Sequence, residues 1–248
     1  MSVMADSFRV AWIDMRFVRH NILSILVSCL IAPLLYLVAF GYGLGRGMTV
    51  DGYDYISFMI PGVIALSTLT SCFSTVSTKV MMQRVYYQSF DELFLCSMSA
   101  TAMVLGKAYA GVVRGLISAS ILYALGMFIS DDMHLTVAAV AMIVLSCLLF
   151  SMLGVMCGML ANSHQTQTLL TSLLIMPMTF LCGTLFSLEA LPGFAQTVIG
   201  LLPLTHTTVC IRSSMLGSGL PLYSLLIVLV YGLIFFAVSS YVLQKGRK

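Results

Sequence analysis

Six long apolar segments constrain this chain more than any other feature of its sequence. A helix that crosses the hydrocarbon core of a bilayer needs about 20 mainly apolar residues. Segments of this kind lie at residues 22–44, 56–78, 109–129, 135–161, 168–186 and 222–243. Together they take up a little over half of the 248 residues, which leaves no room for a sizeable soluble domain. The sequence therefore predicts an all-α membrane protein with six transmembrane helices in a single domain, residues 1–248.

The composition agrees with this prediction and excludes other classes of protein. Only 8% of the residues are charged, whereas about 25% are charged in an ordinary soluble domain. A formal net charge of +3 leaves no basic face for phosphates, so a nucleic-acid-binding domain is not expected either. The seven cysteines form no C-x-x-C pair and lie mostly in apolar runs. We interpret them as small buried side chains and expect neither a zinc site nor a disulfide framework.

The distribution of Lys and Arg predicts the orientation in the membrane, because short cytoplasmic loops retain these residues. With six crossings, nine of the twelve basic residues fall on one side and only Arg46 and Arg212 on the other, while Arg114 lies within the third span. The nine are Arg9, Arg16, Arg19, Lys79, Arg84, Lys107, Lys245, Arg247 and Lys248. Both termini are therefore expected in the cytoplasm. The first apolar run is too long for a signal-peptide core and lacks a small-residue cleavage site, so no cleavage is expected.

The residues before the first span, 1–21, favour a helix that lies in the membrane interface. Phe8, Trp12 and Met15 recur at helical spacing, and Arg9 and Arg16 fall off that stripe. This pattern is typical of an amphipathic interfacial helix. Two interpretations remain: a plain membrane anchor, and a helix that also contacts a partner.

The connection between the second and third spans predicts a short cytoplasmic helix. Ser89 is placed to cap a helix that begins near Phe90, and Glu92, three residues after Ser89, completes a capping box. The helix would present Phe90 and Phe94 to the cytosol, as a docking surface for a partner. The alternative is that these aromatic side chains only enter the headgroup layer.

Residues 187–221, before the last span, are too apolar for a free loop. The segment is broken by Pro192-Gly193 and by Pro203. Two short helices that dip back into the membrane from outside fit these breaks, provided that the freed backbone groups are buried in protein or face a cavity. We therefore predict a re-entrant hairpin.

These features together resemble the six-span permeases of type-2 ABC exporters over nearly the whole chain. The stretch with Arg84, Phe90-Asp91-Glu92-Leu93 and Gly106-Lys107 is similar to the part of that family that holds the coupling helix. The run 180–192, followed by Leu202-Pro203-Leu204-Thr205-His206, looks like its fifth span, outer re-entrant helices and short proline motif. Phe58-Met59-Ile60-Pro61-Gly62 looks most like the branch with lipo-oligosaccharide (nodulation-type) and drug exporters.

The resemblance implies a permease subunit of the inner membrane that pairs with a second permease and with two cytoplasmic ATPase subunits. The chain has no G-x-x-x-x-G-K-[ST] loop. It is therefore expected to be no enzyme by itself and to bind no cofactor, with ATP and Mg on the partner subunit. Because six helices form only half of such a conduit, a homodimer is the simplest arrangement.

Three sets of candidate residues follow, and no metal site is expected. The predicted coupling residues are Arg84, Phe90, Asp91, Glu92, Leu93 and Lys107. The predicted substrate path contains Arg114, Phe180, Phe186 and Tyr231. The predicted outer re-entrant gate contains Glu189, Pro192, Pro203, Thr205 and His206. For Arg114, snorkelling or structural pairing competes with contact to an anionic substrate group. For His206, the alternative to a gate residue is a polar anchor whose hydrogen bonds are satisfied. For Asp91 and Glu92, the alternative to an ATPase contact is a solvated loop.

Two glycine pairs and two rival functions complete the sequence-based expectations. Gly111 and Gly115, and likewise Gly154 and Gly158, stand four residues apart and let helices approach closely, either for packing or for gating. A secondary transporter or channel would need an ionisable relay, a polar filter or inverted repeats within the spans. An intramembrane enzyme would need a nucleophile with a base or a metal triad. The sequence shows none of these, and it does not identify the cargo: lipid-linked saccharides, glycolipids and amphipathic drugs all remain open.

Overall fold

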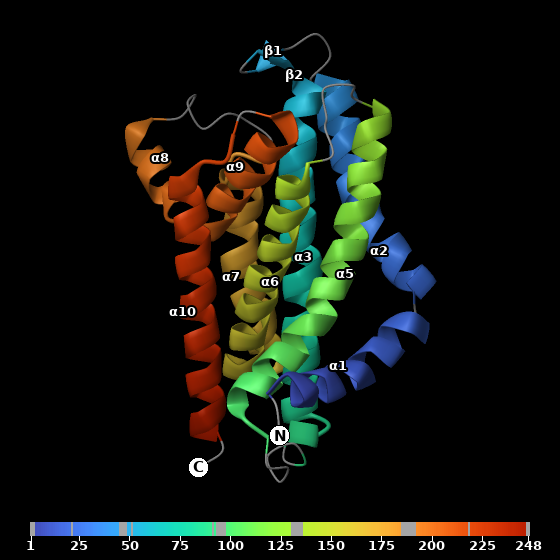
Figure 1. The fold of residues 1–248 in the computed structure, drawn as a ribbon, viewed down its shortest axis with the longest axis vertical. Coiled ribbons are helices and arrows are strands. Elements are labelled where there is room, and N and C mark those ends of the chain that lie inside the picture. The colour runs from blue at the N-terminus through green and yellow to red at the C-terminus, as the bar shows by residue number, and fades with distance from the viewer. Residues whose placement is uncertain are drawn as a thin grey trace.

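The computed structural model describes residues 3–20, 22–44, 49–50, 52–90, 92, 98–129, 136–184, 192–217 and 219–246. The elements in chain order are α1 (Val3–His20), α2 (Ile22–Tyr36), the π-helical segment η1 (Leu37–Leu44), β1 (Thr49–Val50), β2 (Tyr53–Asp54), α3 (Tyr55–Val85), α5 (Ala100–Ile129), α6 (Val137–Leu160), α7 (His164–Leu181), α8 (Gly193–Gly200), α9 (Pro203–Leu216) and α10 (Leu222–Gly246). The described residues are predominantly helical (Figure 1). The small antiparallel pair β1–β2 corrects the expectation of a wholly helical chain.

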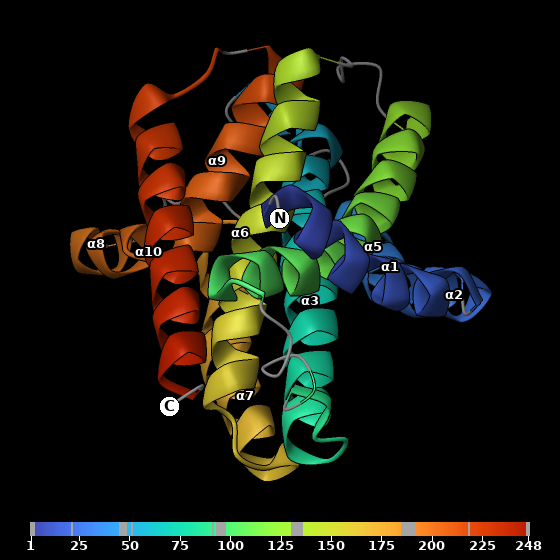
Figure 2. The same cartoon turned by 60° about the horizontal axis from the view of Figure 1, so that its bottom comes forward.

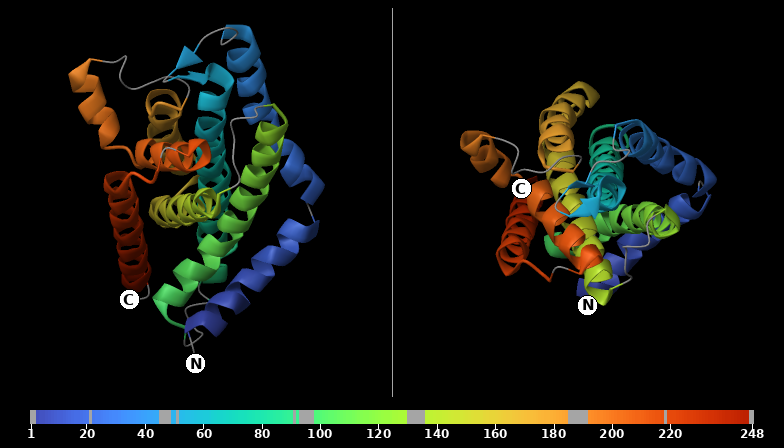
Figure 3. Two further views of the ribbon diagram at one scale, coloured as in Figure 1. Left: turned by 45° about the horizontal axis from the view of Figure 1, so that its top comes forward. Right: turned by 90° about the horizontal axis from the view of Figure 1, so that it is seen from above.

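Helix α3 forms the centre of the bundle. It packs most extensively against α6 and α5, and it also contacts α9, α7, η1 and α2. Seen from above, α2 and α10 lie on opposite sides of the molecule with α3 between them (Figure 3). Most of the side chains of α3 are buried, including Phe58 and Phe73. A helix that is apolar around most of its circumference buries itself among others, which explains this central position.

The two glycine pairs bring α5 and α6 close to α3. A Cβ atom on Gly111 or Gly115 of α5 would overlap side chains of α3, Val76 and Cys72 respectively. On α6, a Cβ on Gly158 would lie 2.7 Å from the carbonyl oxygen of Ser77. Gly154 faces α3 in the same way. The structure thus accounts for these glycines by close helix packing.

The described residues contain four helices long and apolar enough to cross a membrane: α3, α5, α6 and α10. The predicted span 22–44 coincides with α2 followed by η1, but the helix contains Pro33 and changes its geometry. Helix α7 opens with polar residues such as His164 and does not pass as a span by itself. Helices α3 and α5 extend beyond their predicted spans at the end of the bundle that carries α1, where both helices continue through the basic residues Lys79, Arg84 and Lys107.

Two short helices, α8 and α9, lie between α7 and α10, as the positions of the prolines predicted. Helices α8 and α9 meet at an angle of 91°. Pro203 stands at the start of α9, where a missing N–H carries no penalty. A bent pair of this kind is compatible with a broken span as well as with a re-entrant loop.

Helix α1 packs against the first turns of α5 (Figure 2), at the end of the bundle where α10 also ends (Figure 1). Its buried face contains Asp6, Val10 and Ala11, and Gly106 of α5 lies directly against Val10. Phe8 and Trp12 are exposed on the opposite face, with their ring centroids 6.0 Å apart. The aromatic side chains therefore point away from the bundle, as an interfacial helix requires.

Candidate functional site

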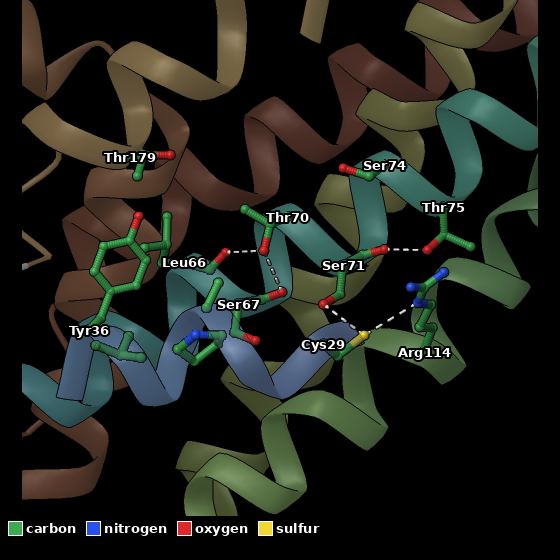
Figure 4. Close-up of a pocket in the computed structure, with 13 residues that line it drawn as sticks. Cys29, Tyr36, Leu66, Ser67, Thr70, Ser71, Ser74, Thr75, Arg114 and Thr179 are labelled. Carbon is green, nitrogen blue, oxygen red and sulfur yellow. Dashed lines mark hydrogen bonds between the residues drawn. The ribbon is translucent and has the colours of Figure 1, made fainter. Parts of the chain in front are cut away.

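A cavity of about 310 Å³ lies beside the middle of α3 (Figure 4). Its walls come from four helices: α2 contributes Cys29 and Tyr36, α5 contributes Arg114, and α7 contributes Thr179. The wall formed by α3 is rich in hydroxyl groups. The α3 residues that line this cavity are Val63, Leu66, Ser67, Thr70, Ser71, Ser74 and Thr75.

A second cavity, of about 790 Å³, continues along α3 toward the α1 end of the bundle. It shares Ser74, Thr75 and Arg114 with the first cavity. Its remaining lining residues are Ile25, Thr78, Lys79, Met82, Gln83, Tyr87, Ser89 and Ala110. Because the two cavities share lining residues, we treat them as one α3 groove. The groove follows α3 for about six helical turns at 5.4 Å each, most of the depth of a bilayer.

One face of α3 supplies the polar lining of the groove. Its hydroxyl residues are spaced three and four apart, which places them on one side of the helix. They are Ser67, Thr70, Ser71, Ser74, Thr75 and Thr78. Thr70 donates to the Leu66 carbonyl at 3.0 Å and Thr75 to the Ser71 carbonyl at 2.6 Å. Such bonds satisfy hydroxyl protons inside a membrane helix and leave oxygen lone pairs for other donors.

Arg114 is a cation that faces both parts of the groove. Its Nε donates to the Cys29 sulfur at 3.4 Å, and the Ser71 hydroxyl donates to the same sulfur at 3.6 Å (Figure 4). The predicted path residue Arg114 thus lines both cavities that make up the α3 groove. Lys79, which the sequence analysis used only for orientation, lines the same groove.

The two other predicted path residues that the structure describes, Phe180 and Tyr231, do not line the α3 groove with Arg114. Phe180 is 60% exposed on α7, although its neighbour Thr179 reaches the groove. Tyr231 lies on α10, and its hydroxyl donates to the Leu201 carbonyl at 2.6 Å, between α8 and α9. Phe186 falls outside the described residues. Tyr231 therefore lies outside the α3 groove, and its hydroxyl serves the α8–α9 connection.

Arg84, predicted to flank an ATPase contact, instead joins α3 to the end of α6. Its guanidinium donates to the Met159 carbonyl, to the Ala161 carbonyl at 2.7 Å and to the Asn162 side-chain oxygen at 2.7 Å. The last carbonyls of a helix have no partner within the helix and attract cations. We call this arrangement the Arg84 clamp.

Phe90 is not presented to the cytosol as predicted. It is only 1% exposed and belongs to a cluster with Val80 and Met103. The ammonium group of Lys107, itself only 7% exposed, lies 5.8 Å from the ring centroid of Phe90. Apolar burial together with the cation over the ring holds this side chain inside the bundle. Phe90 and Lys107 therefore support the connection and are not exposed for docking.

Of the remaining coupling residues, only Glu92 is described, and it is exposed. Asp91 and Leu93 lie outside the described residues. The Ser89 hydroxyl donates to the Gln83 carbonyl at 3.3 Å. Among the described residues of this connection, the exposed aromatic side chains are Tyr86 and Tyr87, which the sequence analysis missed. Phe94 lies outside the described residues.

The predicted gate residues that are described tie α8 to α9. The Thr205 hydroxyl donates to the Ile199 carbonyl at 2.8 Å. The Nε2 of His206 lies 2.8 Å from the Gly200 carbonyl, and its Nδ1 lies 3.3 Å from the Ser224 hydroxyl of α10. His206 is thus a satisfied polar anchor. Pro192 precedes α8, Pro203 begins α9, and Glu189 falls outside the described residues.

Arg212 of α9 is a functional candidate that the sequence analysis did not select. Its Nε donates to the Phe58 carbonyl at 3.1 Å, and a terminal nitrogen donates to the Gly183 carbonyl at 3.0 Å. The side chain thereby connects α9 with the start of α3 and the end of α7.

Among the described residues, no three His, Cys, Asp or Glu side chains come together in a way that could hold a metal ion.

Comparisons with known proteins place the chain in a family. The family model for ABC-2 type transporters matches residues 10–216. The inner membrane transport permease YadH of Escherichia coli (strain K12) is 27% identical over 236 residues, 92% of each chain. Nodulation protein J of Rhizobium meliloti (strain 1021) is 32% identical over 210 residues, 80% of this chain and 76% of the relative. Nodulation protein J of Rhizobium leguminosarum bv. viciae is 27% identical over 227 residues, covering 90% and 88%.

The family match extends over most of the chain and includes the helices that form the groove. The similarity to a named inner membrane permease agrees with several helices that are apolar enough to cross a bilayer. This multi-pass inner membrane protein therefore belongs to the ABC-2 type transporter family.

Proposed function

We propose that this chain is the transmembrane permease subunit of an ATP-driven ABC exporter and that the α3 groove is its path for cargo. The observation that carries the proposal is the hydroxyl-lined face of α3, which extends from Ser67 to Thr78 within a helix otherwise buried among apolar side chains. A polar stripe inside a membrane bundle marks a functional surface, because desolvated polar groups are unfavourable there.

The proposed topology has six crossings within one domain. The spans are α2 with η1, α3, α5, α6, α7 and α10, and the bent pair α8–α9 re-enters the membrane from outside. The C-terminal ends of α3 and α10, whose last turns contain Arg84 and Lys245, lie at the same end of the bundle as α1 (Figure 1). Basic residues are retained in the cytoplasm, which supports cytoplasmic termini.

The energy source in this proposal is a pair of cytoplasmic ATPase subunits that bind ATP and Mg. The chain has no phosphate-binding loop of its own. A second copy of the permease completes the conduit as a homodimer. Helix α7 supports this arrangement, because an apolar row of exposed side chains runs along it: Leu169, Leu173, Met176 and Phe180.

The coupling contact with the ATPase is assigned to the connection after α3. Tyr86, Tyr87 and Glu92 are its exposed described residues, and Asp91 and Leu93 complete the set by family resemblance. The Arg84 clamp joins this connection to the end of α6. A displacement of the connection would therefore move α3 and α6 together, which is what a bistable bundle needs for alternating states.

The cargo class proposed here is lipid-like, saccharide-linked or amphipathic. The mixture of hydroxyl groups with Met82, Ile25 and Tyr36 along the groove suits a molecule with polar and apolar parts. The resemblance of residues 58–62 to the lipo-oligosaccharide and drug exporter branch points in the same direction.

The test reconstitutes the permease with its ATPase subunits in liposomes and measures ATP-driven transport of a fluorescent lipo-oligosaccharide and of an amphipathic dye. The double variant T75V/T78V removes two hydroxyls while keeping side-chain shape. The expected result is at least about a tenfold loss of transport, if each hydroxyl contributes about 1 kcal/mol. The matched control, T168V, removes an exposed hydroxyl that likewise bonds to its own helix, at 2.9 Å from the His164 carbonyl. Transport that persists without ATP would contradict the proposal.

A further inference from the structure

The part of the α3 groove nearest α1 is lined by two basic side chains, which a path for uncharged cargo does not need. Lys79 of α3 and Arg114 of α5 both line this cavity of about 790 Å³. Two cations that face one concave volume with low-dielectric walls concentrate anions there. The cavity therefore has an electrostatic preference as well as a shape.

Hydroxyl groups surround the position between the two cations. Thr75 and Lys79 are one helical turn apart on α3, about 6 Å along the axis. Thr78 accepts a hydrogen bond from the Gln167 amide nitrogen at 2.8 Å, and its hydroxyl proton can be donated to another acceptor. Ser74 is exposed to the cavity. An anion with several oxygen atoms matches this set of cations and hydroxyl donors.

The rest of this cavity is apolar. Ile25, Met82 and Ala110 line it, and Tyr87 stands at its exposed edge. A free inorganic anion would leave these surfaces uncovered, whereas the hydrocarbon part of an amphiphile would bury them at about 25 cal/mol per Å². The lining thus fits a ligand with an anionic head and an apolar tail.

The depth of the site agrees with a headgroup. Helix α1, with the exposed rings of Phe8 and Trp12, packs on Gly106 of α5. Arg114 follows Gly106 by eight residues, about 12 Å along the helix. An interfacial helix lies at the boundary between headgroups and acyl chains, so the backbone of Arg114 lies about 12 Å from that boundary, a depth from which a long basic side chain can reach back toward the headgroups.

We propose that this end of the α3 groove is a binding site for an amphiphile with a phosphate-type anionic headgroup, held between Lys79 and Arg114. Its apolar part lies against Ile25, Met82 and Tyr87. The inference rests on the proposed function in one respect, that the same groove is the cargo path, and it names the class of molecule that enters it. The ligand's source is either a membrane phospholipid or a phosphate-bearing cargo, and both share this chemistry.

Binding is measured on the purified full-length permease without ATPase, by native mass spectrometry in neutral detergent. The three probes are dioctanoyl phosphatidic acid, dioctanoylglycerol, which has the same tails without the phosphate, and inorganic phosphate. The phosphatidic acid is expected to bind at least about tenfold more tightly than either other probe. Equal binding of phosphatidic acid and dioctanoylglycerol would overturn the anionic site. Equal binding of phosphatidic acid and inorganic phosphate would overturn the amphiphile.

Variants then locate the site. K79Q and R114Q are each expected to weaken binding of phosphatidic acid at least about fivefold, given about 1 kcal/mol for a cation near an anionic headgroup. K79R and R114K retain the charge and are expected to restore most of the affinity. If R114Q does not fold, the pair K79Q and K79R decides alone. Unchanged affinity in K79Q and R114Q places the ligand elsewhere and refutes the site.

Two control variants separate this site from general lipid binding. K245Q removes a cation from the last turn of α10, at the same end of the bundle but outside the groove. G232L fills a wholly apolar cavity of about 260 Å³ between α5, α6 and α10. Neither change is expected to alter the preference for phosphatidic acid, and a loss in either variant equal to that in K79Q would overturn the assignment.

The results of these experiments distinguish a failure of the binding site from a failure of the proposed function. Phosphatidic acid bound through Lys79 and Arg114, with no ATP-driven transport after reconstitution, would remove the exporter and leave the site. ATP-driven transport of neutral amphiphiles by the wild-type permease, with phosphatidic acid bound no more tightly than dioctanoylglycerol, would leave the exporter and remove the site. For the source of the ligand, retention of phospholipid during purification identifies the membrane, and stimulation of the ATPase by phosphate-bearing cargo alone identifies the cargo.

Discussion

The guanidinium of Arg212 stacks on the ring of Phe58, with 3.6 Å between its central carbon and the ring centroid. The same guanidinium donates to the backbone carbonyl of Phe58. Through its second bond, to Gly183, it also holds the segment that follows α7. One side chain of α9 thus fixes the start of α3 and the end of α7, at the end of the bundle opposite to α1.

Replacing Arg212 by alanine is expected to loosen the segment 182–184 and to destabilise the protein by about 2 to 4 kcal/mol, because two carbonyls lose a charged donor. Phe58→Leu keeps the two hydrogen bonds and removes only the ring, so a loss of about 1 kcal/mol is expected. Cys182 is 1% exposed and serves as the reporter. Its alkylation, followed by peptide mass spectrometry, should rise strongly in R212A and little in F58L; equal labelling of both variants would contradict this role.

The Arg84 clamp predicts a destabilisation that lysine does not prevent. A lysine has one ammonium group and cannot reproduce the planar fork that reaches Ala161 and Asn162 together. R84K and R84A are therefore both expected to lower the thermal midpoint in detergent, with a loss of about 1.5 to 3 kcal/mol for R84A. Arg16→Ala, on the exposed face of α1, provides the control and should change little. A midpoint of R84K equal to wild type would show that the charge alone is sufficient.

Gly62 and Gly232 form a matched pair of helical glycines with opposite surroundings. A Cβ on Gly62 would overlap the backbone carbonyl of Thr184, whereas a Cβ on Gly232 would meet nothing within 4 Å. Gly62→Ala is therefore expected to destabilise by at least about 1 to 3 kcal/mol, through overpacking against backbone. Gly232→Ala is expected to be neutral or stabilising by up to about 1 kcal/mol. The thermal unfolding midpoints of the two variants, measured in the same detergent, test this prediction. A midpoint of G62A equal to that of the wild type would contradict the close contact between α3 and residue 184.

The proposed orientation predicts which side chains react from which side. Tyr87, after α3, and Phe194, in α8, are both highly exposed. In inverted and right-side-out vesicles, Y87C should react with a membrane-impermeant thiol reagent only from the cytoplasmic side and F194C only from the outer side. The wild-type chain, whose six described cysteines are buried, provides the background. Reaction of both variants from one side would refute the six-crossing topology.

The sequence predicted the bounds of the helices better than it predicted which side chains pack against each other. The bounds of α6 and α10 lie within a few residues of the expected spans, because apolar runs are long and their ends are polar. The ends of α3 and α5 were missed, since hydropathy detects where lipid ends and not where a helix ends. Phe90 was assigned to the surface because its burial depends on Met103 and Val104 of α5, which the sequence does not place beside it.

The candidate site was predictable only in part, for a similar reason. The spacing of Ser67, Thr70 and Ser74 is visible in the sequence, and it shows that these hydroxyls share one face of a helix. It does not show that α2, α5 and α7 leave a groove along that face. Arg84 and Arg212 bind backbone carbonyls that lie 75 and 154 residues away. Every residue has a backbone carbonyl oxygen, so no pattern in the sequence shows which carbonyls Arg84 and Arg212 bind.

The most direct test of the central claim is to obstruct the α3 groove after the transporter has folded and assembled. Ser74 lines both parts of the groove and is exposed to it. In the reconstituted complex of permease and ATPase, S74C should transport its amphipathic cargo with ATP until a bulky methanethiosulfonate reagent is attached, and reduction of that bond should restore transport. The same reagent on the wild-type complex should change little, because Cys29 in the groove is buried. Undiminished ATP-driven transport by the fully labelled S74C complex would contradict the account.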